Sequence, residues 1–97
     1  MNEFFSSLAK RWTDAAGRRG AAIAPPDLDP AVAEELLQLA RVVAHSKERS
    51  FAPLASFTAG VAAERLRAAK GGDAAAMASY IREIREALET EAAAGRA

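Results

Sequence analysis

Large hydrophobic residues recur along the chain three or four positions apart, which is the spacing of one face of an α-helix. No alternating pattern long enough for a β-strand occurs. The helical spacing predicts four helices, at about residues 3–16, 30–45, 53–70 and 74–94. The residues that carry it are Phe4, Leu8 and Trp12; Val32, Leu36, Leu39 and Val43; Leu54, Phe57 and Val61; and Met77, Ile81, Ile84 and Leu88.

Residues with special backbone preferences stand where these helices should begin. Asn2, Asp29 and Asp73 are candidate N-caps, because their side-chain oxygens can accept a hydrogen bond from a free N–H of the first turn. Pro30 and Pro53 suit the first helical position, where a missing N–H has no consequence. These start signals agree with the helices that the hydrophobic spacing predicts.

The four predicted helices indicate an all-α fold, a compact four-helix bundle-like single domain over residues 1–97. Gly17 is the expected end of the first helix, since glycine commonly follows a helix C-terminus. Gly60 falls inside the third helix, where glycine costs about 1 kcal/mol relative to alanine. We expect the close approach of another helix to compensate for Gly60.

Composition narrows the classes of function. Alanine accounts for 26 residues, so the hydrophobic fraction of 51% overstates the supply of large core side chains. The absence of cysteine excludes disulfides, a thiol nucleophile and Cys-ligated zinc or iron–sulfur sites. Thirteen basic and thirteen acidic residues give a net charge of zero. This balance removes the simplest electrostatic argument for binding to nucleic acid or to an anionic membrane.

The chain also lacks a pattern typical of a membrane protein or of a secretory signal. Glu3 lies close to the start, and no long apolar run follows it. The longest uncharged stretch, Ser50–Ala63, has 14 residues and contains Pro53. A bilayer-spanning helix needs about 20 apolar residues. We therefore predict a cytoplasmic protein without membrane contact.

Polar side chains concentrate around the end of the second predicted helix, in the segment Arg41–Arg49. His45 could act as a general base oriented by Glu48. The alternative is structural: a histidine at a helix C-terminus interacts favourably with the helix dipole, and Glu48 and Arg49 can satisfy backbone groups of the turn. Because no nucleophile or set of metal ligands accompanies His45, we favour the structural interpretation. We predict no catalytic residue, no enzyme activity, no metal and no resident cofactor.

The aromatic residues have two interpretations. Phe4, Phe5, Trp12, Phe51 and Phe57 could line a ligand pocket between helices. Aromatic residues at helical spacing are more often part of a core, which is the interpretation we favour here. Phe51 is the best candidate for a partly exposed contact, because it lies in a predicted connection.

One segment resembles a known family. It runs from Leu37 to Leu54 with the sequence LQLARVVAHSKERSFAPL, and Phe57 and Gly60 follow. The pattern is similar to that of a family of small helical domains of unknown function from high-GC bacteria. Its members have a helix ending in Ala-His, two variable residues, Glu-Arg, a short gap, Ala-Pro-Leu and a helix with Phe and Gly. This chain has Ser50 where the family often has proline.

The resemblance has implications for function. Family members occur alone or fused to proteins similar to the molybdenum-cofactor guanylyltransferase. The resemblance thus implies a non-enzymatic accessory or interaction domain linked to maturation of the molybdenum cofactor, molybdopterin guanine dinucleotide, with that enzyme or a related one as partner. The candidate site, either a partner-docking patch or a fold-defining turn, consists of His45, Glu48, Arg49, Phe51 and Pro53.

Two alternative functions remain open at this point. The chain could be a helical bundle that binds a small ligand or cofactor, although no residue is indicated for such binding. It could also be a structural module that forms a homodimer through the small-residue face of the third helix.

Overall fold

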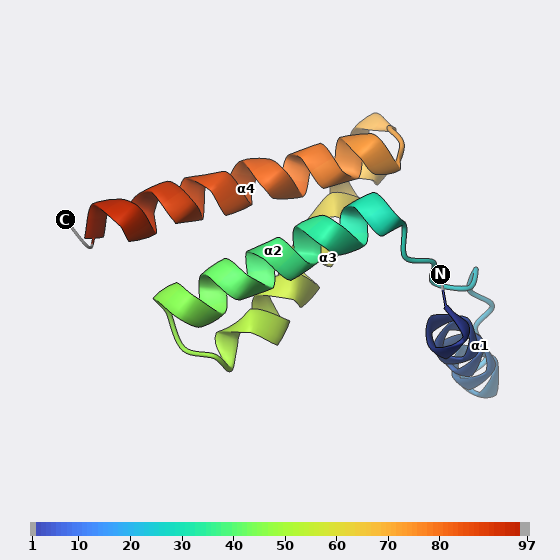
Figure 1. The fold of residues 1–97 in the computed structure, drawn as a ribbon. Helices are drawn as coiled ribbons and strands as arrows, with labels where there is room; N and C mark the ends of the chain where they lie inside the picture. The colour runs from blue at the N-terminus through green and yellow to red at the C-terminus, as the bar shows by residue number, and fades with distance from the viewer. Residues whose placement is uncertain (1, 96–97) are drawn as a thin grey trace. The chain divides into compact units, whose positions relative to one another are not determined.

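The computed structural model describes residues 2–95 and is all-α over that range, with no strand. Four helices are observed, which confirms the predicted fold class (Figure 1). The chain divides into two units, Met1–Pro30 and Ala31–Ala97, and each is described by itself. The helices are α1 (Glu3–Arg18), α2 (Pro30–Ser46), α3 (Phe51–Lys70) and α4 (Ala74–Gly95).

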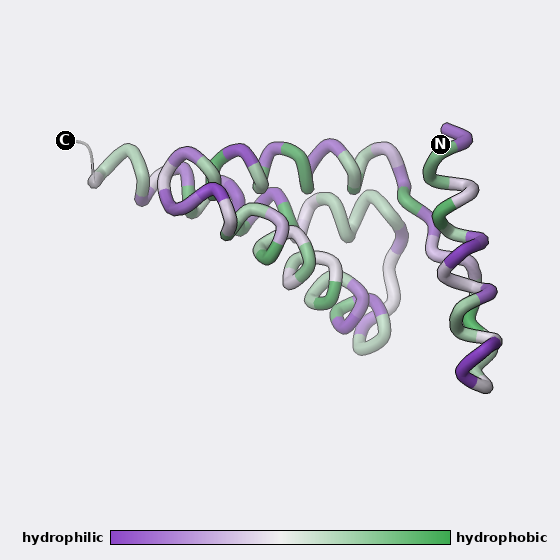
Figure 2. The backbone as a smooth tube through the Cα atoms, turned by 90° about the horizontal axis from the view of Figure 1, so that it is seen from below, coloured by the Kyte–Doolittle hydropathy of each residue, from purple (hydrophilic) through white to green (hydrophobic). Residues whose placement is uncertain are grey.

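The N-terminal unit consists of α1 and the irregular segment after it. Asn2 caps α1 as predicted, because its Oδ1 accepts a hydrogen bond of 3.2 Å from the N–H of Phe5. The expected end near Gly17 is wrong. The helix continues to Arg18, and the left-handed conformation that follows belongs to Gly20, with φ of 80°. Polar and apolar residues alternate along α1, as the purple and green tube beside the N label shows (Figure 2).

The C-terminal unit consists of three helices and a small core. Helices α2 and α4 run in the same direction, and α3 runs opposite to both (Figure 1). Alanine makes up much of α3 and α4, so their backbones can approach closely with few large side chains between them. The buried apolar residues are Val32, Leu39 and Val43 of α2, Ala63 of α3, and Ala78 and Ile81 of α4.

Helix α3 begins earlier than predicted. The N–H of Phe51 donates to the carbonyl of Glu48 at 3.0 Å, and the N–H of Ala52 donates to that of Arg49 at 3.1 Å. The turn therefore leads directly into the helix. Pro53 is the third helical residue, so its predicted place at the first position is wrong. The proline is still tolerated, because the N–H groups of the first turn have no partner within a helix.

Gly60 lies in the middle of α3 with open space beside it. A Cβ atom built on Gly60 would meet no atom within 4 Å outside its own stretch of helix. The expected close approach of another helix of this chain at Gly60 is therefore wrong. Packing within the chain does not explain why glycine occupies this position.

A buried ion pair joins α2 to α4. Glu35 is only 6% exposed, and its carboxylate accepts hydrogen bonds from Nε of Arg82 at 2.8 Å and from Nε of Arg85 at 3.0 Å. Arg85 also pairs with Glu89 one turn later. Arg82 and Glu86 have the same spacing, but Arg82 pairs with Glu35 instead.

The protonation of Glu35 follows from these contacts. Burial favours the neutral acid and by itself raises the pKa, but the hydrogen bonds from Arg82 and Arg85 outweigh it. The net effect lowers the pKa of Glu35 below its ordinary value of 4.5. A lowered pKa means that the ionised form stabilises the fold. This stabilisation is complete above the ordinary pKa and is lost as the pH falls through the lowered one.

We predict that Glu35→Gln lowers the free energy of unfolding by about 2 kcal/mol at neutral pH, since it removes charge-assisted hydrogen bonds from a buried position. The variant should also lose part of the wild type's dependence on pH in the range below 4.5. Urea unfolding followed by circular dichroism measures both effects. Glu86→Gln on the exposed side of α4 is the control, and equal losses in the two variants would contradict the prediction.

We predict that Gly60→Ala raises the free energy of unfolding by about 0.5 to 1 kcal/mol, because alanine is the better helix former and its Cβ meets open space. Chemical denaturation of dilute protein measures the change. Gly71→Ala is the opposite case, since Gly71 has φ of 79° and an alanine there would be strained. A loss of stability in Gly60→Ala would show that something fills the space beside Gly60.

Candidate functional site

The predicted turn begins where α2 ends. Ser46 Oγ donates a hydrogen bond of 2.7 Å to the carbonyl of Val42, and the N–H of Lys47 donates one of 2.8 Å to the carbonyl of Val43. These bonds satisfy carbonyls of the last helical turn. His45 lies in that turn with its side chain exposed.

Glu48 and Arg49 serve the turn through their backbones. Their carbonyls accept the first hydrogen bonds of α3. Over residues 2–95, neither side chain has a hydrogen bond or ion pair, so the two residues satisfy backbone groups of the turn through their carbonyls and not through their side chains. Glu48 also makes no hydrogen bond to His45, and the structure therefore does not show the oriented general base that the spacing allowed.

The structure separates the five candidate residues. His45 faces α4, whereas Glu48 and Arg49 lie exposed in the connection to α3. Phe51 is 46% exposed on the first turn of α3, which agrees with its predicted partial exposure, and Pro53 is exposed on the same turn.

His45 lines an open groove of about 420 Å³, which we call the α2-end groove. It forms because α2 and α4 run in the same direction and their C-terminal ends lie together (Figure 1). Sequence reasoning missed the half that α4 contributes, since no local spacing shows which helix ends meet. The residues of the groove are His45, Ser46 and Lys47 after α2, and Leu88, Glu91, Ala92 and Gly95 of α4.

The α2-end groove offers polar groups that are free to bind. Within the described part of the chain, the side chains of His45, Lys47 and Glu91 have no hydrogen-bond or ion-pair partner. An imidazole, an ammonium group and a carboxylate thus lie around the apolar side chain of Leu88. This set can donate and accept hydrogen bonds and match either sign of charge, as a protein-binding surface requires.

The set is less suited to holding a metal ion. Among residues 2–95, no group of three or more His, Asp or Glu side chains lies close enough to bind one. The α2-end groove contains two side chains of a type that can act as a nucleophile, the Ser46 hydroxyl, which donates to a backbone carbonyl, and the Lys47 amine.

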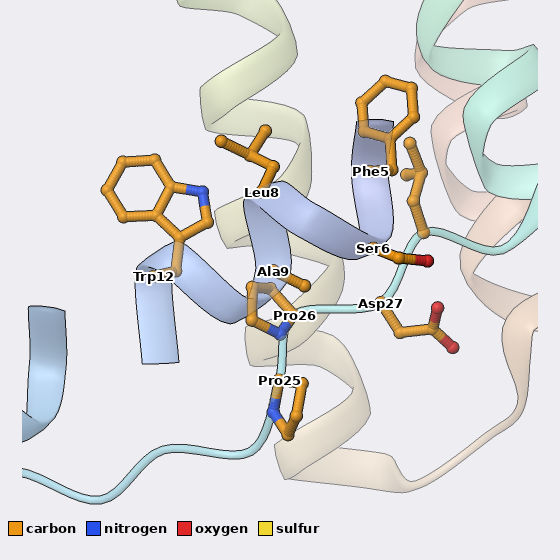
Figure 3. Close-up of a pocket in the computed structure, with 9 residues that line it drawn as sticks. Phe5, Ser6, Leu8, Ala9, Trp12, Pro25, Pro26 and Asp27 are labelled. Atoms are coloured by element: carbon orange, nitrogen blue, oxygen red, sulfur yellow. The ribbon is translucent and has the colours of Figure 1, made fainter. Parts of the chain in front are cut away.

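A second groove lies entirely within the N-terminal unit, and we call it the α1 groove (Figure 3). Its volume is about 610 Å³, and the Pro25–Leu28 segment passes along α1 to form one side. Phe5, Leu8 and Trp12 project from the same side of α1 (Figure 3). The residues of the α1 groove are Phe5, Ser6, Leu8, Ala9, Trp12, Pro25, Pro26, Asp27 and Leu28.

The aromatic residues of α1 are not core residues. No residue of α1 is buried, and Phe4 and Trp12 are 64% and 56% exposed. The favoured interpretation of these aromatics as core is therefore wrong. Asp27 is the one charged residue of the α1 groove. Its carboxylate and the indole of Trp12 lie at opposite ends of the groove (Figure 3).

Comparison with known proteins gives one family that matches nearly the whole chain. A family model described as "Domain of unknown function (DUF6457)" matches residues 5–96. The chain belongs to this family. The match includes α1 through α4, so both grooves and the turn between α2 and α3 are parts of the family's domain. Comparison with curated proteins and with solved structures gives no match.

None of the helices α1 to α4, over the residues described, combines the length and apolar character needed to cross a bilayer.

Proposed function

We propose that the chain is a non-enzymatic accessory domain that docks on another protein through the α2-end groove. The observation that carries the proposal is the convergence around Leu88 of three side chains that have no partner among residues 2–95, namely His45, Lys47 and Glu91. The α2-end groove is open to solvent, which favours docking over catalysis. Catalysis is more efficient where a site excludes water and holds a nucleophile or metal in position.

The proposed partner is an enzyme of molybdenum-cofactor maturation, a guanylyltransferase or a relative of it, in the cytoplasm of a high-GC bacterium. The support is the resemblance of the segment from Ala44 to Leu54 to domains that occur beside or fused to such enzymes. The α2-end groove begins within that segment, at His45, which is one of its family-marking positions.

We predict that Lys47→Glu reduces recovery of the partner at least several-fold, because it reverses one charge in the α2-end groove. The measurement is affinity capture of the tagged chain from its native host, with the cofactor enzyme quantified in each eluate. Lys70→Glu is the matched control, since Lys70 is an exposed lysine at the other end of α3.

Two results would count against this proposed function. One is capture of no cofactor-pathway protein by the wild type, together with normal molybdoenzyme activity in a deletion strain. The other is equal recovery of the partner by the two charge-reversal variants, which would place the docking surface elsewhere.

The α1 groove supports a second candidate function, the binding of a small flat ligand. Phe5 and Trp12 provide exposed aromatic faces for stacking, Leu8 adds an apolar surface, and Asp27 can accept hydrogen bonds from the ligand. Pterins and guanine nucleotides combine flat rings with N–H donors, so they are the first ligands to test.

We predict that such a ligand quenches tryptophan fluorescence and raises the melting temperature, because Trp12 is the one tryptophan of the chain and lies in the α1 groove. Phe5→Ala should weaken binding. Phe4→Ala is the control, since Phe4 is also exposed on α1 but does not line the groove. Unchanged fluorescence and melting temperature for every pterin and guanine nucleotide would exclude this candidate.

A further inference from the structure

Helix α3 is apolar on two sides, although its own unit covers only one of them. Ala63, its one buried residue, faces the core. Leu54, Phe57 and Val61 follow at intervals of three and four residues, and Glu64 and Ala68 continue the same row. We call this stripe, which is apolar except at Glu64, the outer face of α3.

The outer face of α3 is open to solvent. Leu54 is 64% exposed and Phe57 72%. Both lie in the 14-residue uncharged stretch Ser50–Ala63. A helix that is apolar on all sides is normally buried, and a heptad-like stripe of large residues is typical of a surface that packs on another helix. The composition of the outer face therefore predicts that another helix packs on it, whereas Leu54 and Phe57 are exposed to solvent.

A hollow lies next to the most exposed side chains of this face. A shallow, open groove of about 580 Å³ runs along α3 beside Gly60, lined by Phe57, Val61 and Glu64 among others. We call it the Gly60 hollow. One helix thus carries both projecting side chains and a hollow of its own, which is what a self-complementary interface requires.

We propose that the outer face of α3 binds the same face of a second copy of this chain, antiparallel and about a two-fold axis near Phe57. This surface is separate from the α2-end groove, so the inference goes beyond the proposed function and does not depend on it. It also differs from a dimer through the small-residue face of α3, because the contact residues include Leu54 and Phe57.

The register follows from the uncharged stretch. Its middle lies at Ser56 and Phe57, so an axis there pairs the uncharged stretches of the two copies with each other. Phe57 then faces Phe57 of the other copy. Leu54 lies level with Gly60 of the other copy and can enter the Gly60 hollow. Gly60 is thereby explained, because a larger residue would exclude Leu54.

The charged residues on either side of the uncharged stretch Ser50–Ala63 favour an antiparallel pair of α3 helices. With Phe57 opposite Phe57, residues 48 and 49 lie level with residues 66 and 65 of the other copy, so Glu48 is one position from Arg65 and Arg49 is one position from Glu64. Glu48 can pair with Arg65, and Arg49 can share Glu64 with Arg67, which already pairs with it within the chain. Glu48 and Arg49 have no side-chain partner within residues 2–95. A parallel pair would instead bring each of these charges close to its own like charge.

The size of the contact determines how tight the dimer can be. A helix of 20 residues is about 30 Å long. One such pair lies at the small end of specific protein interfaces, so the dimer should dissociate on dilution. Association must therefore be measured as a function of concentration.

The test is sedimentation velocity of the full chain from low micromolar to high micromolar concentration. The wild type should shift from monomer to dimer over this range. Phe57→Glu should remain monomeric, since it places two carboxylates across the axis, and Gly60→Leu should remain monomeric because it fills the hollow. Leu37→Glu is the control that should still dimerise, since Leu37 is 61% exposed but lies on α2.

The outcomes of this test are distinct. A wild type that stays monomeric throughout overturns the proposal, and so does a Gly60→Leu variant that dimerises as well as the wild type. Circular dichroism checks that each variant is folded. Loss of helicity in Phe57→Glu would leave Gly60→Leu to decide, because its new side chain points into open space in the monomer.

The direction of the pair can be tested with cysteines, because the chain has none of its own. Leu54→Cys and Val61→Cys lie on nearly the same level of an antiparallel pair. Oxidation of a mixture of the two variants should therefore give a disulfide-linked dimer in higher yield than either variant alone. Efficient linkage of Leu54→Cys to itself would overturn the antiparallel arrangement.

The test of the dimer and the test of the proposed docking function can fail independently of each other. Lys47 does not belong to the outer face of α3, and Phe57 does not line the α2-end groove. A monomeric chain that still captures its partner overturns the dimer alone. A dimer that captures no partner overturns the docking function alone.

Discussion

The carboxylate of Glu35 is the constraint on which the arrangement of the C-terminal unit depends. A buried carboxylate must keep its hydrogen-bond donors, because an unpaired buried charge is strongly destabilising. Arg82 and Arg85 supply those donors from α4, and their hydrogen bonds favour the register between α2 and α4 that the structure shows. That register determines which C-terminal residues of the two helices meet further along. The α2-end groove is therefore positioned by an ion pair ten residues before His45 on α2.

The constraint matters more because the apolar core is small. Among residues 2–95, six buried apolar residues, two of them alanine, make up the core. Non-directional packing of so few groups would allow helices to slide past one another with little loss. Directional hydrogen bonds from two arginines to one carboxylate limit such sliding. The core supplies much of the stability in this unit, and the ion pair supplies specificity of register.

Local features of the fold could be predicted from the sequence, and long-range ones could not. Asn2 and Asp73 cap α1 and α4 as predicted, because a cap involves residues only three positions apart. The contact of Glu35 with Arg82 spans 47 positions, and helical spacing carries no information on it. For the candidate site, the sequence identified His45 at the end of α2 but not Lys47, and Glu91 became part of the site only through the packing of α4.

The single tryptophan and the single tyrosine lie in different units, at Trp12 and Tyr80. The chain therefore carries one natural optical probe for each part. Fluorescence of the indole reports on the segment around α1, and the tyrosine signal reports on the three-helix unit. Coincidence of the two unfolding curves would mean that the units fold as one cooperative system, and two midpoints would mean that each has its own stability. The distribution of aromatic residues thus makes the cooperativity between the units directly measurable in the unmodified protein.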